Sequence, residues 1–285
     1  MPSSHFPSSI PPRPTSALPP KGPPWDNPIG EAPFAFVDLE MTGLDAAHHR
    51  VIEVCVERVR GDDIVDRLVS LVRPGADASG NEGIHGIESA MLMSAPTFAE
   101  IASRILEILE GAIFVAHAAP YDLAFLRAEF ARLGISFERS WYIDTLTLSR
   151  RAFALPSHSL DALCAHFGLS RPIAHRAEPD VQALREVFRH CKEALSPATA
   201  RDLWEVRVGE RIARAVILAH CEDAVTSARP VHVVYRPRRK MPEAFDMVVT
   251  RVITGLDPPR VIGYQLPGRG RIDLRADRIL SVEPK

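Results

Sequence analysis

The chain has 285 residues, of which 46% are hydrophobic and 25% charged, and its formal net charge is -2 at pH 7. These values are typical of a soluble globular protein and exclude collagen-like, coiled-coil and wholly disordered chains. The four cysteines lie far apart without a Cys-x-x-Cys pair, so we expect no disulfide framework and a cytoplasmic location. We expect no membrane partner, because the chain has no apolar run of about 18 residues and no signal-peptide core.

Charge is divided unevenly along the chain. Residues 229–285 contain 12 Lys and Arg against 6 Asp and Glu, whereas residues 1–228 contain 22 against 30. This division is expected if carboxylates hold metal in one place and arginines meet phosphates in another. The alternative is that the arginines only solvate a small domain.

The predicted elements begin after a proline-rich segment. Residues 1–30 contain 10 of the 25 prolines, and this composition predicts a disordered arm. Three runs rich in Val, Ile and Phe then predict strands of one sheet: Phe34 to Leu39, Val51 to Val59 and Ile64 to Val72.

Helices and strands alternate in the next part of the chain. Thr97 and Glu100 form a capping-box pattern at the start of a predicted helix that ends at Gly111. The further expected elements are a strand at 112–116, a helix at 121–133, a short strand at 141–144, and helices at 160–167 and 179–190. This order predicts an α/β domain over residues 31–195, with a mixed sheet flanked by helices.

The last part of the chain changes from a helical pattern to short predicted strands. Residues 196–228 predict a helical connector. Short runs rich in Val and Ile, separated by Pro and Gly, then predict the strands of a small β-barrel over residues 229–285: 231–235, 247–253, 260–265 and 271–274.

Two acidic residues interrupt the first apolar strand. The two-residue period of a strand places Asp38 and Glu40 on one face of Phe34 to Glu40. Two buried like charges raise a pKa or require a cation, and a divalent metal with oxygen ligands keeps both carboxylates ionised. The alternative is a strand end that emerges into solvent, with both carboxylates exposed.

Three acidic motifs follow one another in the chain. Asp38-Leu39-Glu40-Met41-Thr42-Gly43 closes the first strand, His117 to Leu126 contains Asp122, and His175-Arg176-Ala177-Glu178-Pro179-Asp180 ends in a third acid. In their order and spacing they resemble the motifs of the DEDDh family of 3'-5' exonucleases, and residues 33–190 are similar in texture to the epsilon proofreading subunit of bacterial DNA polymerase III. The resemblance implies a ribonuclease H-like fold.

The resemblance also implies a role for each residue. Asp38, Glu40, Asp122 and Asp180 would hold two divalent cations, Mg²⁺ or Mn²⁺, about 3.5 to 4 Å apart. His175 would be the general base that accepts a proton from the attacking water, and a histidine hydrogen-bonded in a loop is the alternative.

The first motif is also expected to bind the substrate. By the same resemblance, Met41, Thr42 and Gly43 would line the pocket of the 3'-terminal nucleotide, and Leu44 and Phe125 would press on its base. Core packing is the alternative for Phe125. The family commonly has Asn where this chain has Ala118, so an amide that could orient the site is missing.

The basic C-terminal part has a second, shorter resemblance. The strand that ends at Tyr235 and the closing Arg275-Ala276-Asp277-Arg278-Ile279 pattern resemble the WYL domain of bacterial regulators, although the Trp-Tyr-Leu run is absent. This likeness implies an SH3-like barrel that presents Arg271, Arg275 and Arg278 to phosphates. A second candidate for phosphate contact is the cluster of Arg236, Arg238, Arg239 and Lys240, and a solvated loop is its alternative.

The sequence thus predicts a metal-dependent 3'-5' exonuclease that releases nucleoside 5'-monophosphates. DNA is the favoured substrate, RNA is the alternative, and a DNA polymerase is a candidate partner. Three other interpretations stay open, namely a nucleic-acid-binding module without turnover, a polymerase-interaction module, and a nuclease regulated by a ligand of the barrel.

Overall fold

The computed structural model describes residues 18–75, 85–171, 174–237, 240–255, 258–268 and 270–285, with residues 205–214 described by their backbone alone. The chain forms two compact units. The first unit runs to Ala152 and resumes over Ser159–Glu205, and the second comprises Phe153–His158 and Val206–Lys285.

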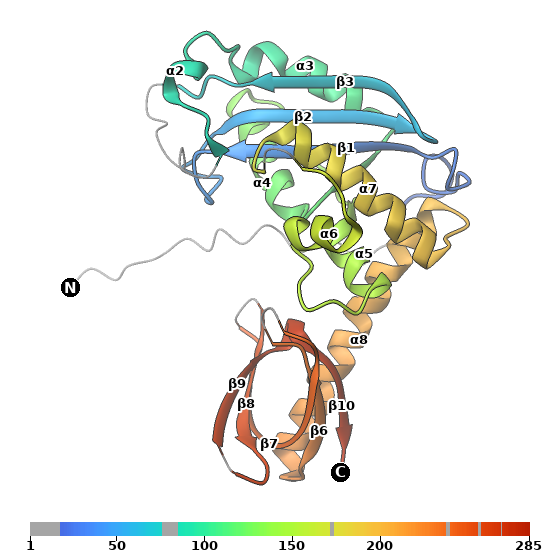
Figure 1. The fold of residues 1–285 in the computed structure, drawn as a ribbon, viewed down its shortest axis with the longest axis vertical. Coiled ribbons are helices and arrows are strands. Elements are labelled where there is room, and N and C mark those ends of the chain that lie inside the picture. Colours follow the sequence, from blue (N-terminus) through green and yellow to red (C-terminus); the bar gives the residue numbers. More distant parts are fainter. Residues whose placement is uncertain (1–17, 76–84, 172–173, 238–239, 256–257, 269) are drawn as a thin grey trace, which may run out of the picture. The chain divides into compact units, whose positions relative to one another are not determined.

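A five-stranded mixed sheet forms the centre of the first unit (Figure 1). Its strands are β1 (Pro33–Met41), β2 (Val51–Arg60), β3 (Asp63–Leu71), β4 (Ile113–Ala116) and β5 (Ile143–Asp144), in the spatial order β3-β2-β1-β4-β5. The strands β1, β2 and β3 are antiparallel, and β4 and β5 run parallel to β1. Gly61 takes a φ of 64° in the two-residue turn between β2 and β3, a conformation that glycine adopts without a steric cost.

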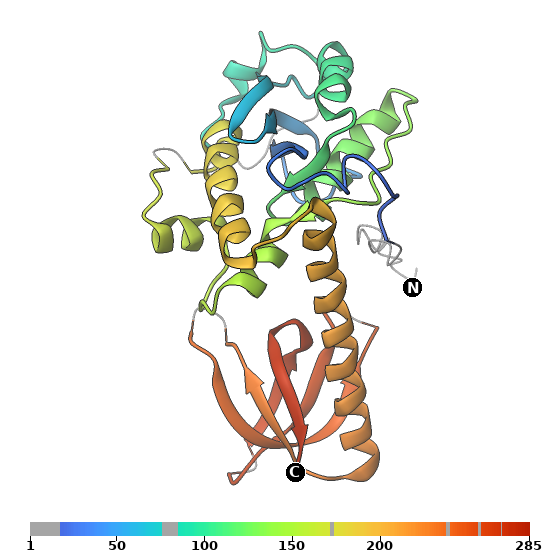
Figure 2. The same ribbon diagram turned by 90° about the vertical axis from the view of Figure 1, so that its right-hand side faces the viewer.

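Helices cover both faces of this sheet (Figures 1 and 2). They are α2 (Ser89–Leu92), α3 (Phe98–Leu109), α4 (Pro120–Arg132), α5 (Thr145–Ala152), α6 (Leu160–Phe167) and α7 (Ala177–Leu195). The predicted capping box is present, because Glu100 accepts a hydrogen bond of 2.7 Å from the backbone N–H of Thr97. Helix α5 was not predicted from the sequence, because it has only two large apolar side chains, Leu146 and Leu148.

The two faces of β1 pack against different helices. Ala35, Val37 and Leu39 belong to the apolar core shared with α3 and α4. On the other face, Phe34 and Phe36 lie 4.9 and 5.4 Å, between ring centroids, from Phe188 of α7. This packing holds α7 across the same side of β1 that carries Asp38 and Glu40 further along the strand.

The second unit contains α8 (Ala200–Ser227) from Val206 onward and a second five-stranded sheet (Figure 2). The strands are β6 (Val231–Tyr235), β7 (Glu243–Ile253), β8 (Arg260–Gln265), β9 (Gly270–Arg275) and β10 (Ile279–Pro284), with a 3₁₀ turn at Ala276–Arg278. Ile217, Cys221 and Ala224 of α8 share a core with the strands, so this part of α8 does more than connect two domains. Although α8 has 28 residues, neither it nor another helix in the described part of the chain is apolar enough to cross a lipid bilayer.

The predicted SH3-like barrel is not confirmed. The order of the second sheet is β10-β6-β7-β8-β9, and its edge strands β9 and β10 do not pair with each other within the described residues. Four of the five strands were predicted from the sequence, and β10, which follows the 3₁₀ turn directly, was not. Closure depends on pairing between the edge strands, which the apolar pattern of single strands does not specify.

The expectation of a disordered arm over residues 1–30 does not hold for its last part. Residues 1–17 lie outside the described residues, but Trp25 is 5% exposed and packs edge-on against Trp204 at 5.9 Å. The backbone N–H of Ile29 donates to Ala198, and Arg201 forms an ion pair with Asp26. A single buried tryptophan with these polar contacts orders a segment whose average composition predicts disorder.

We expect Trp25→Ala to lower the free energy of unfolding by about 3–5 kcal/mol, because it leaves a large cavity against Trp204. Leu18→Ala is the matched control, since Leu18 lies in the same segment and is 58% exposed. Chemical denaturation of both variants measures the difference. Equal, small effects would show that the segment does not contribute to stability.

Candidate active site

Two carboxylates share one face of the central strand. Asp38 and Glu40 are half-buried in β1. The strand register places Asp38 opposite Cys55 and Glu40 opposite Glu53 of β2. Both side chains therefore project on the side of the sheet that α7 covers.

The helix α4 brings a third carboxylate. Pro120 begins this helix, and Asp122 lies in its first turn with 6% exposure. Proline suits this position because its missing N–H would have no partner there, and the helix dipole favours a carboxylate. Burial raises the pKa of Asp122 well above its usual range, and it outweighs the opposing effect of a hydrogen bond from the backbone of Leu39. This hydrogen bond places Asp122 beside β1.

The start of α7 supplies the fourth carboxylate and a histidine. Asp180 lies in the first turn of α7 and is 5% exposed. His175 precedes the helix and is exposed, with a φ of 61°. This left-handed conformation is uncommon for residues other than glycine and is often found where function requires it.

A buried glutamate of β2 fixes the start of α7. Arg176 donates to both carboxylate oxygens of Glu53 at 2.7 to 3.1 Å, and the backbone N–H of Ala177 donates at 2.9 Å. Glu53 is 3% exposed and lies opposite Glu40 in the sheet. Glu53 was not predicted from the sequence, where its one signal is an acidic residue in the apolar run Val51 to Val59.

An arginine that was not predicted from the sequence is paired with Asp180. Nε and Nη2 of Arg171 donate to the two oxygens of Asp180, each at 2.5 Å, and the Arg171 side chain is 7% exposed. Arg171 also forms an ion pair with Asp161. No spacing or motif in the sequence distinguishes this arginine from its neighbours, so it could not have been found without the structure.

The carboxylates raise one another's pKa. Burial, followed by Asp122, Asp180 and Glu40, raises the pKa of Asp38 well above its usual range. Burial and Asp180 raise the pKa of Glu40 to about 8, against the opposing effect of Arg171. Burial also raises the pKa of Asp180, although its hydrogen bonds from Arg171 act in the other direction. The fold thus brings the four predicted acids close enough to repel one another.

The donor atoms of this cluster fit a divalent cation. Glu40, His175 and Asp180 can each offer one ligand atom, and the three atoms lie within 4.8 Å of one another. Carboxylate oxygens are the ligands that Mg²⁺ and Mn²⁺ prefer, and a cation would relieve the repulsion that raises the pKa values. The described residues therefore form a candidate metal site, to which Asp38 and Asp122 are adjacent.

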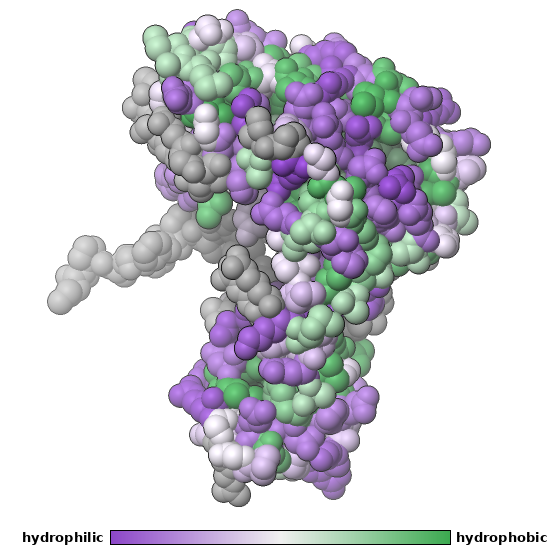
Figure 3. Space-filling model, in the orientation of Figure 1, coloured by the Kyte–Doolittle hydropathy of each residue, from purple (hydrophilic) through white to green (hydrophobic). Residues whose placement is uncertain are grey.

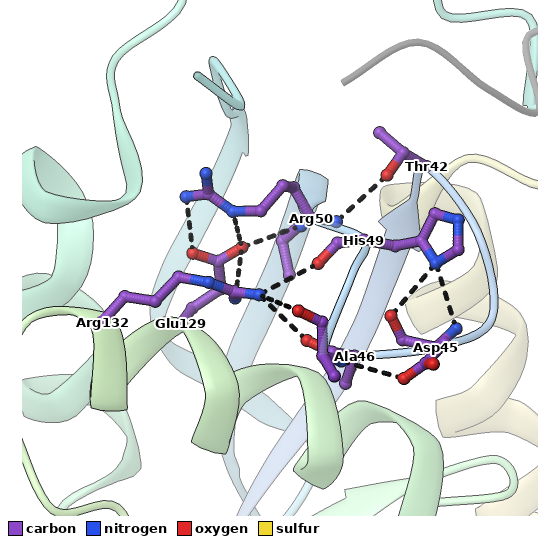
Figure 4. A network of polar contacts seen from close by, with 9 residues as sticks. Thr42, Asp45, Ala46, His49, Arg50, Glu129 and Arg132 are labelled. Carbon is purple, nitrogen blue, oxygen red and sulfur yellow. Dashed lines mark hydrogen bonds and ion pairs between the residues drawn. The ribbon is translucent and has the colours of Figure 1, made fainter. Parts of the chain in front are cut away.

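The loop after β1 contains the residues predicted to bind a nucleotide (Figure 4). Met41 is half-buried, Thr42 is buried and Leu44 is 82% exposed. A Cβ on Gly43 would lie 2.3 Å from the ring of His49, so no larger residue fits there without displacing the histidine. The loop therefore exposes the apolar side chain of Leu44 four residues after Glu40.

Phe125 does not face the site. It is 1% exposed and belongs to the core that α4 shares with β1. A base could reach its ring only if the core opened. We therefore assign Phe125 to the core, which was the alternative that the sequence left open.

Ala118 adopts an unfavourable backbone conformation at the turn before α4. Its φ is 65°, and its N–H donates to Asp144 Oδ1 at 2.9 Å. This left-handed conformation costs about 1–2 kcal/mol for a residue with a Cβ, and Asn tolerates it better than Ala. The conformation at Ala118 would therefore suit an Asn better than the Ala that this chain has.

The arginines predicted to contact phosphates lie in the second unit, on β9 and in the 3₁₀ turn that follows it. Arg271 is exposed on β9, while Arg275 is engaged by Asp277 at 3.0 Å. Arg278 lies in the 3₁₀ turn, and its carbonyl accepts a hydrogen bond from the backbone N–H of Arg236. Figure 3 shows hydrophilic residues over β9 on the face turned to the viewer. Arg238 and Arg239 of the second candidate cluster lie outside the described residues.

Comparison with known proteins connects this site with nucleases. The family model described as Exonuclease (RNase_T) matches residues 35–188. DNA polymerase III PolC-type from Thermotoga maritima is 36% identical over 165 residues, which cover 57% of this chain and 12% of that protein. DNA polymerase III subunit epsilon-like protein from Rhodobacter capsulatus is 35% identical over 60% of this chain and 25% of its own length. The 3'-5' exonuclease DinG from Staphylococcus epidermidis is 33% identical over 53% of this chain and 17% of its own length. The chain spans at most about a quarter of the length of these relatives.

Solved structures of exonuclease I from E. coli share the fold. The zinc-bound complex with single-stranded DNA has a TM-score of 0.56 at 18% identity, over 83% of this chain and 55% of that chain. The complex with a dA16 oligonucleotide has a TM-score of 0.53 at 19% identity, over 82% and 55% of the two chains. This likeness confirms the predicted ribonuclease H-like mixed sheet with flanking helices.

The raised pKa of Glu40 predicts how pH changes the stability of the metal-free protein. Its pKa is about 8 in the folded chain against an ordinary value of 4.5, so the folded state binds more protons than the unfolded state between these pH values. The free energy of unfolding should therefore fall as pH rises from about 5 to 8. Mg²⁺ should raise the melting temperature more at pH 8 than at pH 5, because it competes with those protons.

Thermal denaturation with and without Mg²⁺ across this pH range tests the expectation. Glu40→Gln should flatten the slope of stability against pH, and the exposed Glu110→Gln serves as the matched control. A Glu40→Gln variant that keeps the wild-type slope would contradict the assignment of this proton uptake to Glu40.

Proposed function

We propose that this chain, which belongs to the Exonuclease (RNase_T) family, hydrolyses phosphodiester bonds from the 3' end of nucleic acid and releases nucleoside 5'-monophosphates. One observation carries the proposal: β1, α4 and α7 bring four acids into one cluster, with His175 at its exposed side. Two divalent cations, Mg²⁺ or Mn²⁺, held by Asp38, Glu40, Asp122 and Asp180, would neutralise the phosphate and stabilise the entering and leaving oxygens.

The protein's own residues perform the other tasks. His175 is exposed beside Glu40 and Asp180, where it can accept the proton of the attacking water. The backbone of Met41, Thr42 and Gly43 lines the pocket for the terminal nucleotide, and the exposed Leu44 contacts its base. Phe125 stays in the core and takes no part in this contact.

DNA is the proposed substrate, with RNA as the alternative outcome. The names of the relatives support DNA, because they include two DNA polymerase III proteins, and two solved structures of the fold hold DNA. The same names support a DNA polymerase as a partner. The 2'-hydroxyl of RNA would have to be accommodated by the Thr42–Leu44 pocket, so substrate choice depends on this loop.

We expect 5'-labelled single-stranded DNA to be shortened from its 3' end in the presence of Mg²⁺ or Mn²⁺. Duplex DNA and RNA of the same sequence report strand and sugar preference. Asp122→Asn and Asp180→Asn should abolish the reaction, and His175→Ala should slow it by about 10²- to 10⁴-fold, because it removes a general base. Asp63→Asn, an exposed aspartate of β3, is the control. Activity retained in Asp122→Asn and Asp180→Asn would reject this site.

We further propose that the second unit contacts the phosphates of a single strand through Arg271 and Arg278, in keeping with the resemblance to a WYL domain. Arg271 lies opposite Tyr264 in the β8–β9 ladder, and Tyr264 is 44% exposed. An exposed aromatic ring beside an exposed arginine suits a base and its phosphate. Arg275 contributes less, because Asp277 already neutralises it.

We expect the double substitution Arg271→Ala and Arg278→Ala to weaken binding of single-stranded DNA. The slope of log K against log salt should become shallower by about 0.7 for each phosphate that the variant no longer neutralises. Fluorescence anisotropy without divalent cation measures binding without hydrolysis, and Arg60→Ala, an exposed arginine of β2, is the control. A slope equal to that of the wild type would exclude these two arginines as phosphate ligands.

A further inference from the structure

The loop Thr42–Arg50, which we call the pocket loop, is closed on itself. Thr42 and Arg50 join its two ends, because the N–H of Thr42 donates to the Arg50 carbonyl and the N–H of Arg50 donates to Thr42 Oγ1, each at 3.0 Å. Inside the loop, the N–H of His49 donates to the Asp45 carbonyl at 2.8 Å. The tight contact of Gly43 with the His49 ring leaves little freedom at the tip. The loop thus has one preferred internal shape.

A buried carboxylate of α4 holds the end of this loop (Figure 4). Glu129 is 1% exposed, and its oxygens accept hydrogen bonds from Arg50 Nε at 2.8 Å, Arg50 Nη2 at 2.9 Å and the backbone N–H of Val51 at 3.1 Å. Charge-assisted, two-point contacts of this kind fix direction as well as distance. Glu129 therefore determines where β2 begins and where the loop returns.

A second arginine, Arg132, connects Glu129 with the backbone of the pocket loop. Arg132 lies one turn after Glu129 in α4 and approaches its carboxylate at 3.5 Å. Its Nη2 also points to the backbone carbonyls of Ala46 at 3.0 Å and of Ala47 and His49 at 3.4 Å. The loop is thus tied to α4 through its own backbone, independently of most of its side chains.

The same helix carries an acid of the candidate active site. Asp122 and Glu129 are seven residues apart, two turns of α4, and so lie on one face of the helix. One rigid element therefore holds both a carboxylate of the acidic cluster and the base of the pocket loop. A shift of the loop relative to α4 changes the distance between the terminal nucleotide and the acids.

We propose that Glu129 is a positioning residue, which holds the pocket loop through Arg50 and Arg132 so that the 3'-terminal nucleotide meets the acidic cluster in the reactive position. This role rests on the proposed exonuclease function. Glu129 touches neither the scissile phosphate nor a cation. It acts by setting the place of Thr42, Gly43 and Leu44, and a misplacement of about 1 Å can reduce a rate by about 10²-fold.

Glu129→Gln tests the proposal, because it keeps the shape of the side chain and removes the charge that orients two arginines. We expect kcat/KM on single-stranded DNA to fall by about 10²-fold. We also expect weaker binding of thymidine 5'-monophosphate, measured by calorimetry with Mn²⁺. The rise in melting temperature on adding Mn²⁺ should stay at the wild-type value, since the four acids are unchanged.

Two further variants separate positioning from stability. Arg132→Ala removes the contacts with three loop carbonyls without emptying a buried site, because its side chain is 31% exposed, and it should reproduce the loss in part. Arg127→Ala is the control on the same helix, since Arg127 pairs with Glu138 instead. Its kcat/KM and nucleotide affinity should equal those of the wild type.

A Glu129→Gln variant with a lower melting temperature but wild-type kcat/KM and nucleotide affinity would overturn the positioning role. If the wild-type protein did not hydrolyse nucleic acid, that result would reject the proposed function instead. Nucleotide binding by the wild type and Glu129→Gln would still test the pocket loop in that case.

Discussion

Mutual repulsion between the carboxylates of Asp38, Glu40, Asp122 and Asp180 is the constraint that the rest of the first unit has to satisfy. Burial raises the pKa of each carboxylate, and neighbouring acids of the cluster add to this effect at Asp38, Glu40 and Asp122. Repulsion within such a cluster lowers the stability of the fold, so favourable interactions elsewhere in the fold have to offset it. The apolar core under β1 and the Phe188 contacts supply these interactions, because they hold the three elements that carry the acids.

Buried glutamates paired with arginines set the orientation of these elements. Glu53 holds the start of α7 through Arg176, and Glu129 holds the pocket loop through Arg50. Glu57, which is 1% exposed, faces arginines from β3 and α7. Buried ion pairs add little net stability compared with apolar packing, but they fix direction. In this protein they lie between an element of the site and the sheet or helix that supports it, where direction decides the geometry of the acids.

Local patterns in the sequence predicted the parts of the site that follow from chain geometry. The two-residue period places Asp38 and Glu40 on one face, and the strand register agrees. Arg171, nine residues before Asp180, and Glu129, 79 residues after Arg50, could not be predicted, because no local pattern links either of them to the residue it holds. The composition of a segment also averages over single residues. The packing of Trp25 against Trp204 was therefore not predicted from its proline-rich surroundings. Phe125 illustrates the same limit, since helical spacing does not distinguish a core face from a pocket.

Arg171 completes the electrostatic arrangement without removing Asp180 from the site. A carboxylate has about four acceptor positions, and the two hydrogen bonds of Arg171 occupy one on each oxygen. Asp180 therefore keeps acceptor positions free, and one of its oxygens lies within 4.8 Å of donor atoms of Glu40 and His175. Because the guanidinium is planar and largely buried, it fixes the plane of the carboxylate while it offsets part of the negative charge. Arg171 thus offsets part of the repulsion between the acids and also orients Asp180 toward the position that a cation would take.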